Sequence, residues 1–368
     1  MQRHLYKYIW IYTVLIIGMG LLALYSAAYQ NVRVPHKIFF DQLGSVLMAL
    51  PVMFFLGRID YRKFYDIAYL FYAFNLLLLI WVLVSGRLAL GAQRWIEIGG
   101  FSFQPSELMK FSLILMLGRY FSNRRPTLSF NFMNRTQEFF RDLIVPFVLT
   151  AVPMVLIFKQ PDLGTALLIF GIFLVMLLTS GLEYRYISGF IIFCLLLMPV
   201  GWHVLQPYQK DRLLVFLNPN IDPLGAGYTI IQSKIAIGSG QLFGKGWLSG
   251  TQNQLNFLPE RHTDFIFSVI GEEWGLAGTL LVVYFYFAVI NCGLTIAEQV
   301  KDKFGTLVAM GIVANLSLQV IINIGMVMGL LPVVGITLPF VSYGRSSLLV
   351  FVVMMGFLLN LSKRRTIF

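Results

Sequence analysis

Ten long apolar stretches dominate the 368-residue chain, and they favour a bundle of membrane-spanning helices over any soluble fold. A helix needs about 20 consecutive, mostly apolar residues to cross the hydrocarbon core of a bilayer. Barrel strands alternate between apolar and polar residues, whereas runs such as Leu76–Val84 are apolar throughout. We therefore predict an all-α polytopic membrane protein, with ten transmembrane helices in a single integral membrane domain over residues 1–368. The stretches cover residues 9–28, 38–57, 66–85, 105–122, 143–158, 163–181, 186–206, 265–290, 304–328 and 338–361.

The positive charge of the chain sets its expected orientation. A net charge of +11 would suggest a nucleic-acid partner for a soluble protein, but cytoplasmic loops of membrane proteins also collect Lys and Arg. The side that holds the termini carries 16 of these residues, and the opposite side carries 10, of which 5 lie in the long segment 207–264. Long segments follow the charge rule least. We therefore predict cytoplasmic termini, an external segment 207–264 and no nucleic-acid partner.

The predicted external loops hold most of the unusual residues. Segment 207–264 is the longest, and loops longer than about 15 residues are usually functional or disordered. It has seven glycines between positions 225 and 250, interleaved with Tyr and Ile. This mixture predicts ordered structure that dips partly into the membrane, and it places the activity at the outer face.

Asp264 is the first candidate for chemistry, because it stands at the expected outer mouth of the eighth stretch. A carboxylate at the edge of hydrocarbon is costly and suggests a functional site. It suits a general base, but Asp is equally suited to be the N-cap of the following helix. His262 is a candidate substrate-binding residue next to Asp264, with a hydrogen-bonded loop histidine as the structural alternative. A zinc site is not expected, since the sequence has neither a Cys-x-x-Cys nor a His-Glu-x-x-His pattern.

A second group of charged residues lies at the start of the fourth and sixth stretches. Glu107 and Lys110 are three residues apart and therefore share one helix face. They form either a structural ion pair or part of a substrate cavity. Asp162 is again either an N-cap or a functional carboxylate, and Trp95 suits an interfacial anchor. A diphosphate at the outer leaflet would need cations, although any one of them is more often simply solvated. The candidates are Arg94, Lys159, Arg212, Lys234, Lys245 and Arg261.

Several short motifs follow one another along nearly the whole chain, at residues 91–95, 104–107, 160–165, 222–228, 232–240, 244–247 and 257–267. Together they resemble the SEDS family (shape, elongation, division and sporulation). Residues 247–252, with Arg261 before His262-Thr263-Asp264, resemble its RodA branch.

One departure stands out: the family usually has Ser-Tyr-Gly-Gly-Ser where this chain has Arg345 after Gly344. We expect Arg345 to be tolerated, because its long side chain can reach water or an acidic neighbour.

The resemblance implies a bacterial inner-membrane glycosyltransferase that polymerises lipid II, the undecaprenyl-diphosphate-linked disaccharide-pentapeptide, during cell elongation. It implies that Asp264 is the catalytic base, and that Trp95, Glu107, Lys110 and Asp162 are functionally important. A class B penicillin-binding protein and other elongation-complex proteins are the implied partners.

The implied reaction inverts the anomeric centre, so it needs one base but no second carboxylic acid if cations neutralise the leaving diphosphate. A divalent cation, Mg or Mn, would suit that diphosphate, although the sequence shows no dedicated ligand set. The alternatives are a lipid II flippase, which would need polar cavities open to both faces, and a non-catalytic scaffold for the penicillin-binding protein, in which Asp264 is only a cap.

Overall fold

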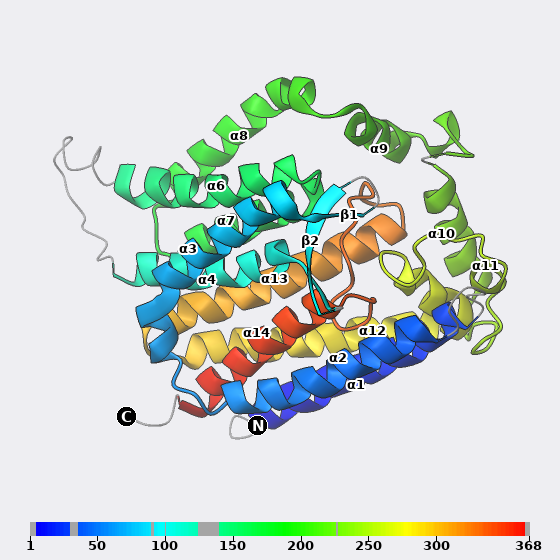
Figure 1. The fold of residues 1–368 in the computed structure, drawn as a ribbon, viewed down its shortest axis with the longest axis horizontal. Helices are drawn as coiled ribbons and strands as arrows, with labels where there is room; N and C mark the ends of the chain where they lie inside the picture. Colours follow the sequence, from blue (N-terminus) through cyan, green and yellow to red (C-terminus); the bar gives the residue numbers. More distant parts are fainter. Residues whose placement is uncertain are drawn as a thin grey trace. The chain divides into compact units, whose positions relative to one another are not determined.

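The computed structural model describes residues 5–29, 36–89, 92–99, 101–123, 140–225 and 227–364. All ten predicted stretches fall on helices, which Figure 1 labels along the chain. These helices are α1 (Leu5–Ala28), α2 (Lys37–Leu56), α3 (Arg62–Ser85), α4 (Pro105–Ser122), α6 (Val145–Lys159), α7 (Leu163–Thr179), α8 (Tyr184–Val204), α12 (Ile266–Gln299), α13 (Lys303–Val327) and α14 (Arg345–Arg364).

The protein is an all-α polytopic membrane protein. In the described part of the chain, seven helices are long and apolar enough to cross a membrane, by length and composition. They correspond to α1, α2, α3, α6 with the preceding π-helical turn η2 (Phe140–Ile144), α12, α13 and α14. α7 and residues 184–197 of α8 form shorter apolar helices. The prediction of ten crossings stays a prediction.

The helices separate into two compact units, each assembled from three separate pieces of the chain. Unit 1 contains residues 1–52, 202–292 and 319–352. Unit 2 contains residues 53–201, 293–318 and 353–368. Helices α2, α12, α13 and α14 each contribute to both units. The single integral membrane domain stays a prediction.

Unit 2 is centred on α4, whose residues are nearly all buried, and α4 packs most extensively against α3. Between these two helices, residues 87–103 form a small antiparallel sheet instead of the loop that the sequence suggested. Its strands are β1 (Arg87–Ala89), β2 (Ala92–Ile98) and β3 (Phe101–Phe103), in that order. Trp95 and Arg94 lie on β2, and the sheet therefore fixes their positions more firmly than a loop would.

In unit 1, the described residues of the predicted long segment are 207–225 and 227–264. It contains α9 (Pro207–Leu217), the 3₁₀ turn η3 (Pro219–Ile221), α10 (Tyr228–Ser239) and the single turn α11 (Thr251–Gln254). α14 begins at Arg345, seven residues later than the predicted stretch. The intervening backbone bonds elsewhere: the Ser342 hydroxyl accepts from the amide of Leu338, and the Tyr286 hydroxyl donates to the carbonyl of Pro339.

Helix α12 is interrupted at Gly275, which the sequence did not predict. The φ and ψ angles of Gly275 are 64° and −160°, a region that only glycine occupies readily. The loop before α11 supplies the hydrogen bonds that the break would otherwise leave unmade. The amides of Leu276 and Ala277 donate to the carbonyls of Gln241 and Leu242, at 2.8 and 3.0 Å. In return, the amide of Lys245 donates to the carbonyl of Glu272, at 3.0 Å.

We expect Gly275→Ala to destabilise the protein by at least about 1–3 kcal/mol, because alanine strains this backbone conformation. Its Cβ would also lie 2.3 Å from the backbone nitrogen of Gly244. The matched control is Gly44→Ala inside α2, where a Cβ meets nothing within 4 Å and should be neutral or slightly stabilising. Thermal unfolding of the purified variants measures both, and equal melting temperatures would contradict the strain at Gly275.

Candidate active site

Asp264 lies in a turn, residues 260–265, that leads into α12, and three separate contacts hold this turn in unit 1. The Asn323 side chain on α13 donates to the Asp264 carbonyl at 2.9 Å. The Ser342 hydroxyl donates to the Thr263 carbonyl at 2.5 Å. The backbone amide of Tyr343 donates to the His262 carbonyl at 2.8 Å. The turn is therefore fastened to α13 and to the segment before α14.

The Asp264 side chain itself is half-buried and adjoins Gly335. A Cβ built on Gly335 would lie 3.6 Å from Oδ2 of Asp264, so that glycine backbone faces the carboxylate. The φ angle of Gly335 is +75°, which favours glycine at this position. α12 begins at Ile266, two residues after Asp264, so both the capping interpretation and the general-base interpretation stay open at this point.

Four of the predicted cations, Arg212, Lys234, Lys245 and Arg261, lie in the same unit as Asp264. Nη1 of Arg212, on α9, donates to the carbonyl of Val333, two residues before Gly335, at 3.3 Å. Lys234, on α10, lies against Gly329, whose built Cβ would be 2.6 Å from Nζ. Arg212 and Lys234 are exposed, and both border the 329–335 segment that also adjoins Asp264.

Arg261 and His262 are part of the turn that holds Asp264, and their surroundings are mainly protein rather than solvent. Nε of Arg261 donates to the carbonyl of Ala27 at the end of α1, at 2.9 Å. Burial lowers the pKa of Arg261, which still remains a cation at neutral pH. Burial also lowers the pKa of His262, and the nearby Arg261 lowers it further, while Glu260 partly opposes both effects. His262 is therefore neutral at pH 7.

Lys245 has a different setting from the one its predicted role in diphosphate binding suggests. Its Nζ pairs with Oε1 of Glu272 on α12, at 2.7 Å, and the Glu272 side chain is fully buried. The neighbouring Glu273 accepts from the hydroxyl of Ser26 at 2.5 Å and from Nδ2 of Asn253 at 3.2 Å. These two carboxylates bind the loop before α11 to α12, next to the break at Gly275.

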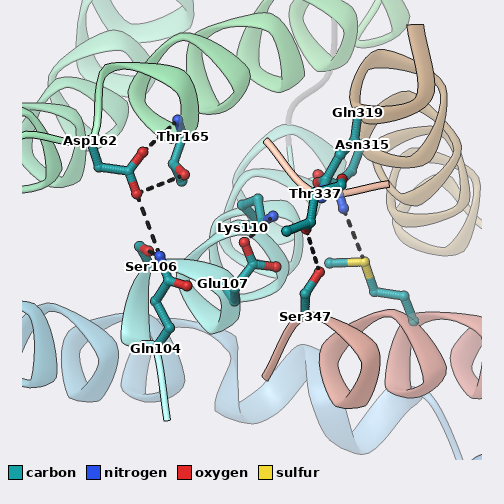
Figure 2. A network of polar contacts seen from close by, with 11 residues as sticks. Gln104, Ser106, Glu107, Lys110, Asp162, Thr165, Asn315, Gln319, Thr337 and Ser347 are labelled. Atoms are coloured by element: carbon teal, nitrogen blue, oxygen red, sulfur yellow. Dashed lines mark hydrogen bonds and ion pairs between the residues drawn. The ribbon is translucent and has the colours of Figure 1, made fainter. Parts of the chain in front are cut away.

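Unit 2 brings together a second set of predicted residues, drawn in Figure 2. Glu107 and Lys110 form a buried ion pair of 2.8 Å on α4, as the three-residue spacing suggested. Oε2 of Glu107 is buried and has no hydrogen-bond partner among the described residues. Asp162 is the N-cap of α7 and accepts from the backbone amide of Thr165 at 3.2 Å. Gln104 also reaches Asp162, at 3.5 Å.

Arg94 and Arg345 both hold backbone or side-chain groups of neighbouring segments. Arg94 donates to the carbonyls of Gln160 and Pro161, directly before α7. Nε of Arg345 donates to the hydroxyl of Ser45 on α2, at 3.3 Å. The guanidinium of Arg345 therefore has a polar contact within unit 1, although its tolerance stays a prediction.

Sequence reasoning missed a row of buried amides on α13. Asn315, Gln319 and Asn323 are spaced by four residues, which places them on one helix face. Figure 2 shows Gln319, which donates to the carbonyl of Thr337 at 3.0 Å, and Asn315, whose amide contacts the sulfur of Met354. The sequence feature that could have predicted this row is the helical spacing of three amide side chains within an otherwise apolar stretch.

The described residues contain no group of three or more His, Cys, Asp or Glu side chains that could hold a metal ion. A divalent cation bound with a diphosphate substrate would have to take most of its ligands from that diphosphate and from water.

We expect Lys110→Met to destabilise the protein by about 3–5 kcal/mol, because it leaves Glu107 buried without its counter-ion. The double variant with Glu107→Gln should recover most of this loss. The exposed pair between Arg87 and Glu97 is the matched control, and Arg87→Met should change stability by less than about 1 kcal/mol. Thermal unfolding in detergent measures the stability of each variant. A Lys110→Met variant as stable as the unsubstituted chain would show that the Glu107–Lys110 ion pair does not stabilise the protein.

Comparison with known proteins identifies the family. The family model described as "Cell cycle protein", which covers FtsW, RodA and SpoVE, matches residues 6–367. The peptidoglycan glycosyltransferase MrdB of Escherichia coli K12 is 40% identical over 361 residues, covering 96% of this chain and 93% of that protein. The peptidoglycan glycosyltransferase RodA of Treponema pallidum is 32% identical and covers 98% of each chain.

Solved structures agree with these sequence relatives. A chain of a peptidoglycan synthase complex, studied for its coordination of polymerization and crosslinking, superposes with a TM-score of 0.81 at 32% identity, covering 98% of both chains. The rod shape determining protein RodA of Thermus thermophilus superposes with a TM-score of 0.71 at 28% identity, covering 97% of this chain and 96% of that one. The chain therefore belongs to the SEDS family of cell cycle proteins, which includes FtsW, RodA and SpoVE.

Proposed function

We propose that this protein is a peptidoglycan glycosyltransferase that polymerises lipid II into β-1,4 glycan strands at the outer face of the cytoplasmic membrane during cell elongation. The observation that carries the proposal is the turn that holds Asp264, with Arg212 and Lys234 bordering the same 329–335 segment. The relatives named as peptidoglycan glycosyltransferases support it over nearly the full chain.

In the proposed reaction, the carboxylate of Asp264 takes the proton from the attacking sugar 4-hydroxyl. The hydroxyl oxygen forms a bond to the anomeric carbon of the donor sugar, on the face opposite the diphosphate, so that the configuration inverts. The bond between this carbon and the diphosphate oxygen breaks, and the electron pair leaves with the diphosphate. Arg212 and Lys234 would stabilise this leaving group, because cations bind diphosphate oxygens strongly.

Three expectations complete this proposal. The termini are cytoplasmic and segment 207–264 is external, which puts Asp264 at the face where glycan strands are built. The partner is a class B penicillin-binding protein, a choice supported by the similarity to a chain of a peptidoglycan synthase complex. Trp95, Glu107, Lys110, Asp162 and the remaining cations other than Lys245, which pairs with Glu272, support lipid II binding. Any Mg or Mn ion would enter with the diphosphate.

Asp264→Asn tests the assigned base. Asparagine keeps the shape of the side chain and caps helices about as well as aspartate, but it does not accept a proton at neutral pH. We expect turnover on labelled lipid II to fall about 10²-fold or more, with unchanged thermal stability. Asp211→Asn, at an exposed site on α9 in the same long segment, is the matched control and should keep full activity. Near-normal polymerisation by Asp264→Asn would remove this residue from the mechanism.

The same preparation separates the two alternative functions. A lipid II flippase would move labelled lipid between leaflets of a vesicle without forming polymer. A scaffold would do neither, and would only raise the activity of its partner penicillin-binding protein. Polymer formed by the unsubstituted chain and lost in Asp264→Asn therefore contradicts both alternatives.

Cysteine labelling tests the orientation. In a chain whose Cys194 and Cys292 are replaced by serine, single cysteines are placed at the exposed positions Asn220, in the long segment, and Glu183, between α7 and α8. A membrane-impermeant maleimide should label position 220 on intact cells and position 183 only after permeabilisation. Labelling of both from the same side would overturn the orientation.

A further inference from the structure

Asn323 is a fully buried amide on α13, and it makes a contact that no catalytic assignment explains. Its Nδ2 carries two protons and uses both. One goes to the carbonyl of Asp264 at 2.9 Å, and the other to the carbonyl of Ile336 at 2.7 Å. These two carbonyls lie in segments that are far apart in the sequence, and a single side chain joins them.

The segments that contain Asp264 and Ile336 also lie against each other at the Asp264 carboxylate. Ile336 directly follows Gly335, whose backbone faces Oδ2 of Asp264. Asn323 therefore fixes the main chain of Asp264 to the same short segment against which its side chain lies. The neighbouring contacts hold only earlier residues of the turn, since Ser342 and Tyr343 bond to the carbonyls of Thr263 and His262. Asn323, in contrast, holds a backbone group of Asp264 itself.

We propose that Asn323 is a positioning residue for the Asp264 carboxylate. It acts through the main chain of Asp264 and does not touch the reacting atoms. This inference rests on the proposed function of Asp264 as a general base. A displacement of about 1 Å at a catalytic group can lower turnover about 10²-fold, even when substrate binding is unchanged. The expected signature is therefore a lower kcat with a nearly constant KM.

The chain contains a close chemical match for a control. Asn360, on α14, is also buried, and its Nδ2 also donates to two backbone carbonyls, those of Leu56 and Ile59. The Oδ1 atoms of both Asn323 and Asn360 are buried without a hydrogen-bond partner among the described residues. Removing either amide should thus cost a similar amount of stability, but only Asn323 holds a backbone group of Asp264.

The experiment measures polymerisation of fluorescently labelled lipid II by the purified full-length chain, with a class B penicillin-binding protein added if the unsubstituted chain requires it. We expect Asn323→Ala to lower kcat by 10-fold to 100-fold, with KM within about threefold. Asn360→Ala should keep kcat within about threefold while losing a similar amount of thermal stability. Asn323→Leu, which keeps approximately the side-chain volume, replaces Asn323→Ala if the alanine variant does not fold.

The outcomes separate this inference from the assignment on which it rests. An inactive Asp264→Asn together with a fully active Asn323→Ala overturns the positioning role alone. An equal loss of kcat in the Asn323 and Asn360 variants also overturns it, because the loss then follows stability. An active Asp264→Asn overturns the assigned base, and the positioning role falls with it, whatever the Asn323 variants show.

Discussion

The need to satisfy every backbone hydrogen bond away from water governs this structure. A membrane protein can interrupt a helix only where protein or trapped water replaces the lost bonds. α12 does so at Gly275, and residues 241, 242, 245 and 246 bond to its amides at 276 and 277 and its carbonyls at 272 and 273. The buried carboxylates of Glu272 and Glu273 then bind residues 245–253 from the side. The hydrogen bonds made at this one break therefore hold much of segment 207–264 against α12, the helix that follows Asp264.

The same requirement explains why the segment before α14 is irregular. Its backbone groups bond to Tyr286, Ser342 and the turn that holds Asp264 instead of to a helical turn. The segment is therefore a structural link between α12, α13 and α14, and the carboxylate of Asp264 lies against it. A catalytic group on such a link is held in a fixed position. A general base needs this fixed position, because it must take a proton from one particular hydroxyl.

Sequence patterns predicted the long helices because the length of an apolar stretch can be counted locally along the chain. The Glu107–Lys110 pair and the cap at Asp162 were also accessible, since spacings of three residues describe contacts within one turn. Contacts between distant segments were not accessible. The pairing of Lys245 with Glu272, the break at Gly275 and the two bonds of Asn323 each join residues that only the tertiary fold brings together. The small sheet was missed because β1 and β3 have only three residues each, and because the seven residues of β2 do not alternate strictly between apolar and polar.

The backbone pairing at Gly275 also limits where related chains can differ in length. Residues 241, 242, 245 and 246 are each bonded to a partner on α12, so an added or missing residue there would shift these bonds to the wrong neighbours. The turn around residues 218–225 has no such register, because its hydrogen bonds are local and its side chains are mostly exposed. Insertions should therefore accumulate on that side of α10, while the stretch between α10 and α11 keeps a fixed length.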